Sequence, residues 1–149
     1  MPLPNLNHEG ELPEGIHQAT IDEVVAQFGS GTEQRIIVTE RLKRIYQLAK
    51  ATGHLQQLLI FGSYITTKPK PNDIDIILIF NDNFDMRTCS EEVKKLLNHQ
   101  QTENEFGASI FWIRPSLLLL ETLEEFIEGW QVKRDGTRRG IIEVNNDSE

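Results

Sequence analysis

The sequence predicts a single domain, residues 1–149, of the α/β (α+β) class, with helices packed on a small mixed β-sheet. Two observations lead to this prediction. Segments with helical hydrophobic periodicity alternate with short β-branched runs, and glycines, prolines or capping residues separate them. The chain has 149 residues, 38% of them hydrophobic and 26% charged, which suits one domain with its own core.

The first elements are an extended arm and two helices. Prolines and glycines recur in residues 1–19 before any periodicity begins, so we expect an extended N-terminal arm there. A capping box at residues 20–23 predicts a short helix that ends at Phe28, before the glycines at 29 and 31. Thr32 should cap a longer helix that continues to about Thr52, where Gly53 ends it. Its apolar face is predicted to contain Ile37, Leu42, Ile45, Leu48 and Ala49.

The remaining elements alternate between strands and helices. Strands are predicted at 57–61, 73–80 and 108–113, and Ser90 should cap a helix from 91 to about 101. A helix is expected over 116–130, followed by a hairpin over 131–144 around an Asp-Gly turn. The inward residues of that last helix are predicted to be Leu117, Leu120, Leu123 and Ile127. Residues 145–149 should form a frayed, solvated tail.

Charge and composition restrict the partners. The net charge is −8, from 23 acidic and 15 basic residues, and such a surface repels the phosphate backbone of nucleic acids. The longest apolar run, 117–120, is far too short to span a membrane, and the first residues do not resemble a secretory signal. We therefore expect a cytoplasmic protein whose partner is a nucleotide carried with Mg²⁺, or another protein. The only cysteine, Cys89, allows no internal disulfide and should be a small, part-buried residue.

The most informative stretch is a Gly-Ser pair followed, after nine residues, by an Asp-Ile-Asp strand. The two-residue period of a strand places Asp73 and Asp75 on one face and the adjacent isoleucines on the other. Two carboxylates on one face repel each other unless they are solvated or share a cation. Oxygen ligands of this kind favour a hard cation such as Mg²⁺.

The residues before and between these strands suit phosphate binding. Gly62 lacks a Cβ and lets the backbone approach a phosphate, while Ser63 adds a hydroxyl and an amide as donors. An α-helix beginning there would favour the anion further. Lys68 and Lys70 in the intervening loop could contact phosphate or simply remain solvated. Arg134, Arg138 and Arg139 at the predicted hairpin have the same two interpretations.

This combination resembles the signature of the DNA polymerase β-like nucleotidyltransferase superfamily. That signature is an apolar residue, Gly-Gly/Ser, a spacer, and then Asp-apolar-Asp/Glu-apolar. The resemblance implies the minimal nucleotidyltransferase fold, with Asp73 and Asp75 as catalytic residues and ligands of Mg²⁺ or Mn²⁺, and Gly62 and Ser63 holding the triphosphate of an NTP. Three blocks, at 12–17, 61–73 and 130–142, also resemble a bacterial family described as nucleotidyltransferase-like.

The sequence departs from that pattern at one position. The superfamily places a third carboxylate on the next strand, where it completes a two-metal site and accepts a proton. Here Ser109 stands at the expected position, and serine can neither neutralise a second Mg²⁺ nor accept a proton near neutral pH. Glu103 and Glu105 precede the strand and could substitute.

Three functions compete on this basis. The first is a metal-dependent enzyme that transfers a nucleoside monophosphate from an NTP to an acceptor, similar to bacterial toxin–antitoxin or defence-linked nucleotidyltransferases that modify a partner protein. The second is a catalytically impaired protein of the same fold that acts as a protein-binding, antitoxin-like module. The third, an accessory that binds nucleic acid, is the least compatible with the net charge of −8.

Overall fold

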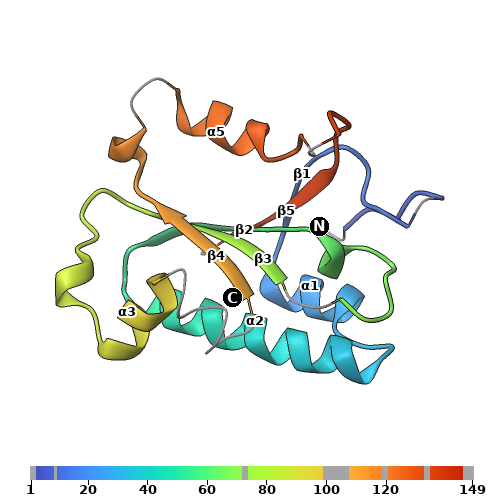
Figure 1. Cartoon of the computed structure of the whole chain (residues 1–149), viewed down its shortest axis with the longest axis horizontal. Helices are drawn as coiled ribbons and strands as arrows, with labels where there is room; N and C mark the ends of the chain where they lie inside the picture. Colours follow the sequence, from blue (N-terminus) through green and yellow to red (C-terminus); the bar gives the residue numbers. More distant parts are fainter. Residues whose placement is uncertain are drawn as a thin grey trace.

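In the computed structural model, one mixed β-sheet lies between helices on both of its faces (Figure 1). The structure describes residues 3–8, 10–71, 74–98, 108–118, 121–132 and 135–145. The five strands of the sheet are, from edge to edge, β1 (Gly15–Ala19), β5 (Gly140–Asn145), β2 (Leu55–Phe61), β3 (Ile74–Phe80) and β4 (Ala108–Ile113). The outer pairs β1–β5 and β3–β4 are parallel, and the inner pairs β5–β2 and β2–β3 are antiparallel. The predicted mixed class is therefore confirmed.

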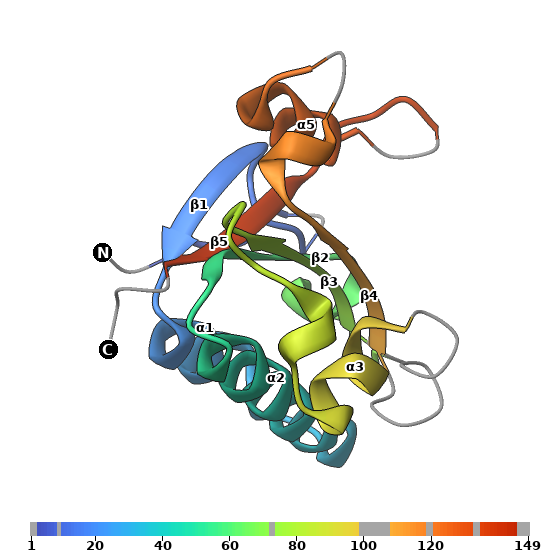
Figure 2. The ribbon, with the colours of Figure 1, turned by 90° about the vertical axis from the view of Figure 1, so that its left-hand side faces the viewer.

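Three helices cover one face of the sheet: α1 (Ile21–Phe28), α2 (Glu33–Ala51) and α3 (Glu91–Leu97) (Figure 2). Their N-termini confirm the predicted caps. The Thr20 hydroxyl accepts the Glu23 amide while the Glu23 carboxylate accepts the Thr20 amide, and Thr32 and Ser90 cap the next two helices. Each cap satisfies amides that have no partner inside the helix, which defines where the helix begins.

The buried side of α2 differs from the prediction by part of a turn. Leu42, Ile45 and Ala49 are fully buried, as expected, but Ile37 is 42% exposed and Val38 takes its place. Val38 fits because it lies four residues before Leu42 and shares its face, whereas Ile37 lies on the neighbouring side. None of the described helices combines the length and apolar character needed to cross a membrane.

The opposite face is covered by the short helix α5 (Leu123–Gly129), which begins at a capping box between Thr122 and Glu125. The prediction of one helix over 116–130 is wrong. Pro115–Leu117 instead forms a single 3₁₀ turn, in which Leu117 is half exposed. The Thr122 cap satisfies the amides of a new helix, which explains the later start. Ile127 is buried and Leu123 partly buried, as expected, and Leu120 lies outside the described residues.

The two ends of the chain meet at one edge of the sheet. The N-terminal arm is not only extended, because its residues 15–19 form β1 and pair with β5. Of the predicted hairpin over 131–144, the described residues form one isolated bridge, between Val132 and Arg138. The strand that follows pairs with β1 and β2 instead, since those longer contacts bury its apolar residues. Asn145 ends β5, and the rest of the predicted tail, 146–149, lies outside the described residues.

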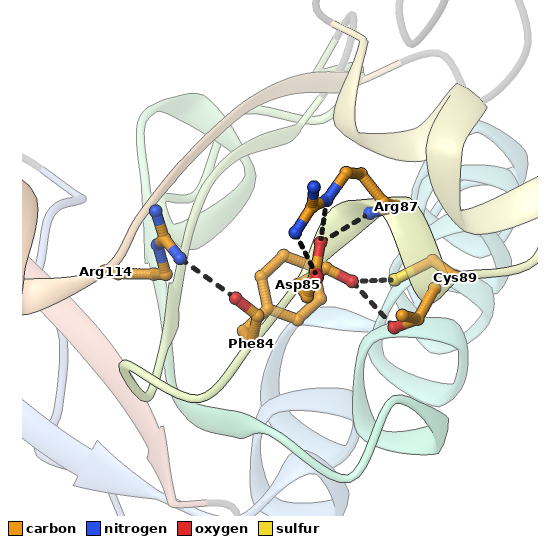
Figure 3. A network of polar contacts seen from close by, with 6 residues as sticks. Phe84, Asp85, Arg87, Cys89 and Arg114 are labelled. Carbon is orange, nitrogen blue, oxygen red and sulfur yellow. Dashed lines mark hydrogen bonds and ion pairs between the residues drawn. The ribbon is translucent and has the colours of Figure 1, made fainter.

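A polar network holds the connection between β3 and α3 (Figure 3). Arg114, just after β4, donates to the Phe84 carbonyl at 3.0 Å, and the Asp85 carboxylate accepts the Arg87 amide and guanidinium. These hydrogen bonds hold the pKa of Asp85 below its usual value. Cys89 donates weakly to the Asp85 carbonyl at 3.6 Å, and burial raises the pKa of its thiol. Cys89 is part-buried, as predicted, and belongs to this structural connection.

Candidate functional site

Three residues of the predicted site, Gly62, Asp75 and Ser109, lie at one end of the sheet, where β2 ends and β3, β4 and β5 begin. Phe61 is paired with Asp75 across β2 and β3, and Asp75 is paired with Ser109 across β3 and β4. Gly62 follows β2 directly. The sheet therefore brings the glycine, one acid and the serine together from three separate parts of the chain.

Asp75 lies on the face of the sheet that α5 partly covers. Ile77 and Ile79, two and four residues further along β3, belong to the hydrophobic cluster on that face. Ile74 and Ile76 are fully buried in the cluster under the three other helices, as the alternating pattern predicted. Asp73, the second predicted acid, lies outside the described residues, so its place on the same face stays a prediction.

Gly62 cannot be replaced without disturbing Asp75. Its φ of 87° and ψ of −161° belong to a region that only glycine adopts easily. A Cβ built on Gly62 would lie 2.2 Å from the Asp75 Oδ2 atom. The glycine thus allows the loop backbone to pass directly over the carboxylate. The sequence predicted that this glycine approaches a phosphate, which stays a prediction; the group that lies against it in the structure is the Asp75 side chain.

Ser63 begins a 3₁₀ turn of three residues, Ser63–Ile65, rather than an α-helix. So short a turn has little of the dipole that an α-helix would direct at an anion. Ser63 is only partly buried and lines a pocket of about 310 Å³. The pocket walls also include Glu11, Gly62, Thr66, Arg139 and Gly140. Lys68 and Lys70 are exposed, farther along the loop, and are not among these lining residues.

Arg139 is the site residue that the sequence singled out least clearly. Its Nε donates to the Trp130 carbonyl at 3.1 Å, and its guanidinium lies 4.6 Å from the centre of the Phe61 ring. Burial lowers the pKa of Arg139, while the nearby carboxylates of Asp75 and Glu11 act in the opposite direction. The guanidinium is therefore close enough to interact electrostatically with both carboxylates.

Its neighbour in the chain has a different role. Arg138 points to the surface, where it forms ion pairs with Glu14 at 2.7 Å and Glu128 at 2.6 Å. Two adjacent arginines in a turn give no sequence signal for which one faces the site. Arg134, the third arginine of the predicted cluster, lies outside the described residues.

Arg35 is a buried residue that holds the loop after β2, and no sequence pattern pointed to it. It is 6% exposed, and its guanidinium donates to the carbonyls of Phe28 at 3.1 Å, Tyr64 at 2.8 Å and Lys68 at 2.8 Å. It also donates to the Thr66 carbonyl. The planar fork of donors satisfies carbonyls that a short loop cannot pair internally. Arg35 thereby fixes the loop that carries Gly62 and Ser63.

The same loop is held from two further directions. Thr32 and Gln34, at the start of α2, donate to the carbonyls of Pro69 at 2.6 Å and Pro71 at 2.9 Å. On the other side, the N-terminal arm lies against the loop: Glu11 forms a bridge with Thr66, and the Thr67 amide donates to the Gly10 carbonyl at 3.0 Å. These contacts place Glu11 at the pocket.

Among the described residues, no group of three or more histidine, cysteine, aspartate or glutamate side chains is placed to hold a metal. Ser109, beside Asp75, occupies the position on the neighbouring strand that the sequence assigned to it. Glu103 and Glu105, the alternative acids, lie outside the described residues. The oxygen donors of Asp75 and Ser109 suit a hard cation with few protein ligands.

A close-packed loop, a carboxylate and a guanidinium thus meet at this end of the mixed sheet and form the candidate site. The chain belongs to a family described as of unknown function, DUF6932, whose model matches residues 4–145. No curated protein and no solved structure matches the chain.

Proposed function

We propose that this chain is a nucleotidyltransferase-like protein that binds an NTP with Mg²⁺ at Gly62, Ser63, Asp73 and Asp75, and transfers a nucleoside monophosphate to an acceptor. The observation that carries the proposal is the contact between the Gly62 backbone and the Asp75 carboxylate, next to Ser109 on the adjoining strand. The order of these elements along the chain and across the sheet fits the minimal nucleotidyltransferase fold. A toxin–antitoxin or defence role, with a partner protein as the modification target, is part of the proposal.

The chemistry requires little from the protein beyond position and charge. A hydroxyl oxygen of the acceptor forms a bond to the α-phosphorus of the NTP, the bond to the bridging oxygen breaks, and pyrophosphate leaves with the electron pair. The hydroxyl proton passes to a carboxylate or to water. Mg²⁺, held by Asp73 and Asp75, would supply positive charge to the phosphate oxygens. Gly62 and Ser63 would position the triphosphate.

A second function is favoured by one observation, the serine beside Asp75. Ser109 gives the site no third carboxylate at that position, so it provides neither the charge for a second Mg²⁺ nor a base. A protein with the same fold could then bind a partner, with or without nucleotide, as an antitoxin-like module. The two functions differ in turnover.

The first experiment is calorimetric titration with ATP, GTP, CTP and UTP in the presence of Mg²⁺. We expect Asp75→Asn to weaken binding of the preferred NTP about tenfold or more, because a metal ligand is lost. Asp22→Asn, on the exposed side of α1, removes the same charge away from the pocket and should bind as wild type does. Equal affinity in the wild type and Asp75→Asn would refute the site.

The second experiment separates the two functions. Ser109→Asp restores a carboxylate beside Asp75, and transfer of label from NTP to the protein or a partner is measured. A rise of about tenfold in the transfer rate corresponds to an activation barrier lower by about 1.4 kcal/mol, and it favours the enzymatic function. Nucleotide binding without transfer in either form favours the antitoxin-like module.

A further inference from the structure

Arg139 is the cation among the described residues that line the pocket beside Gly62 and Ser63. We propose that Arg139 binds the terminal phosphates of the nucleotide, so that the pocket recognises the magnesium complex of a polyphosphate chain. This inference rests on the proposed function and adds to it a residue outside the Gly-Ser and Asp-Ile-Asp motifs.

The side chain is held in place from two sides. Its Nε donates to the Trp130 carbonyl, and its backbone amide donates to the Gln131 carbonyl at 2.7 Å. The guanidinium lies over the Phe61 ring, which packs in turn against the Trp130 ring at 5.0 Å between centroids. A guanidinium over an aromatic face loses fewer orientations when it binds a ligand, because much of that freedom is already lost.

The terminal nitrogens of Arg139 have different hydrogen-bond partners from those of two other arginines. Arg35 directs its terminal nitrogens at four backbone carbonyls, and Arg138 pairs with two carboxylates. Within the described part of the chain, no hydrogen bond occupies the two terminal nitrogens of Arg139. These nitrogens form a planar fork that matches two phosphate oxygens. Arg139 is therefore held through Nε while its phosphate-binding end stays available to a ligand.

The acids around Arg139 determine which ligand can enter. Glu11 lines the pocket with Arg139, and Asp75 lies against Gly62 of the pocket wall; both carboxylates act electrostatically on the guanidinium. A bare polyphosphate would be repelled by these carboxylates, whereas its magnesium complex brings a cation to them. Phosphate oxygens could then lie between the magnesium ion on the aspartate side and Arg139 on the opposite wall. Binding should accordingly require Mg²⁺ and strengthen with the number of phosphates.

The test is calorimetric titration with the magnesium complexes of ATP, ADP, AMP and inorganic tripolyphosphate. We expect the wild type to bind ATP and tripolyphosphate more tightly than AMP. Arg139→Gln should weaken ATP and tripolyphosphate about tenfold or more and change AMP binding much less. Arg138→Gln is the matched control, since it removes the same charge from the neighbouring residue on the surface. It should keep the wild-type order of affinities.

Each outcome supports or overturns the inference. If wild type and Arg139→Gln bind magnesium ATP equally, the inference fails and the proposed function stands. If the wild type binds no nucleotide but binds magnesium tripolyphosphate through Arg139, the inference stands and the proposed function fails. If the wild type binds neither, both fail. Should Arg139→Gln not fold, Arg139→Lys keeps the charge without the fork and is expected to weaken the two polyphosphates selectively; unchanged affinity would overturn the inference.

Discussion

The two faces of the sheet are covered by different helices and carry apolar clusters of different size. Under α1, α2 and α3 lies a continuous apolar cluster to which residues from every strand contribute. Under α5 lies a smaller cluster, and at its margin Phe111 is 43% exposed. The candidate site is on this second face, at its open end, where Arg139 and Gly62 line the pocket and Asp75 lies against Gly62.

The fold therefore separates the residues that hold the loop after β2 from the residues of the candidate site. Arg35 and Thr32, on the side covered by α1, α2 and α3, hold the loop after β2. The backbone of Gly62 lines the pocket on the side covered by α5. A site needs charged groups and access to a ligand, and a fully covered face would penalise the burial of such groups. A short helix that covers only part of the face leaves room for them.

The largest expected effect tests the contacts by which Arg35 holds the loop after β2. Arg35→Met should lower the free energy of unfolding by about 3 to 5 kcal/mol, because four carbonyls lose a buried, charged donor. Arg44→Met, on the exposed side of α2, removes a surface pair with Glu92 and should cost about 0.5 kcal/mol or less. Urea unfolding measures both. Equal losses would mean that the loop is held by other contacts.

A second pair of variants compares the two faces directly. Ile76 and Ile77 are adjacent, are both fully buried, and point to opposite faces of β3. Either change to alanine should cost about 2 to 5 kcal/mol. We expect Ile76→Ala to cost about 1 kcal/mol more, since the shorter α5 can move to fill a cavity more easily than the long α2. A larger loss for Ile77→Ala would reverse the comparison.

The sequence predicted most of what depends on local pattern. Caps at Thr20, Thr32 and Ser90 follow from the side chain and its neighbours three residues away, and all three are observed. The family resemblance placed Ser109 on the strand after Asp75, and the structure pairs these two residues across β3 and β4. The functional roles expected for them stay predictions.

The remaining features depend on contacts between distant segments. Arg35 bonds to carbonyls up to 33 residues away, and nothing in a basic helix reveals which arginine turns inward. Arg139 reaches the pocket because β5 pairs with β2, which brings Gly140 beside the loop at Gly62. The same pairing replaced the predicted hairpin. A local turn signal at Asp135-Gly136 could not compete with two long strand partners.

The smallest expected effect concerns a buried polar contact between α2 and the loop after β2. The Tyr64 hydroxyl lies 2.6 Å from the Thr39 hydroxyl, which itself donates to the Arg35 carbonyl, so Tyr64 donates to Thr39. Burial raises the pKa of Tyr64, and the nearby Arg35 charge opposes this more weakly. Tyr64→Phe should therefore cost about 1 kcal/mol near neutral pH, the value of one buried hydrogen bond.

The raised pKa of Tyr64 also fixes the sign of its pH dependence. Below about pH 9 the phenol is protonated in both states and contributes no slope. As the pH rises through about 10, the unfolded chain loses this proton first, so the free energy of unfolding falls until the folded pKa is reached. The difference between wild type and Tyr64→Phe should therefore shrink at alkaline pH in urea unfolding. The chain has two tyrosines, so absorbance titration of Tyr46→Phe reports on Tyr64 alone. A titration midpoint of Tyr64 at or below about 10 would show that water reaches its hydroxyl, contrary to its burial under α1, α2 and α3.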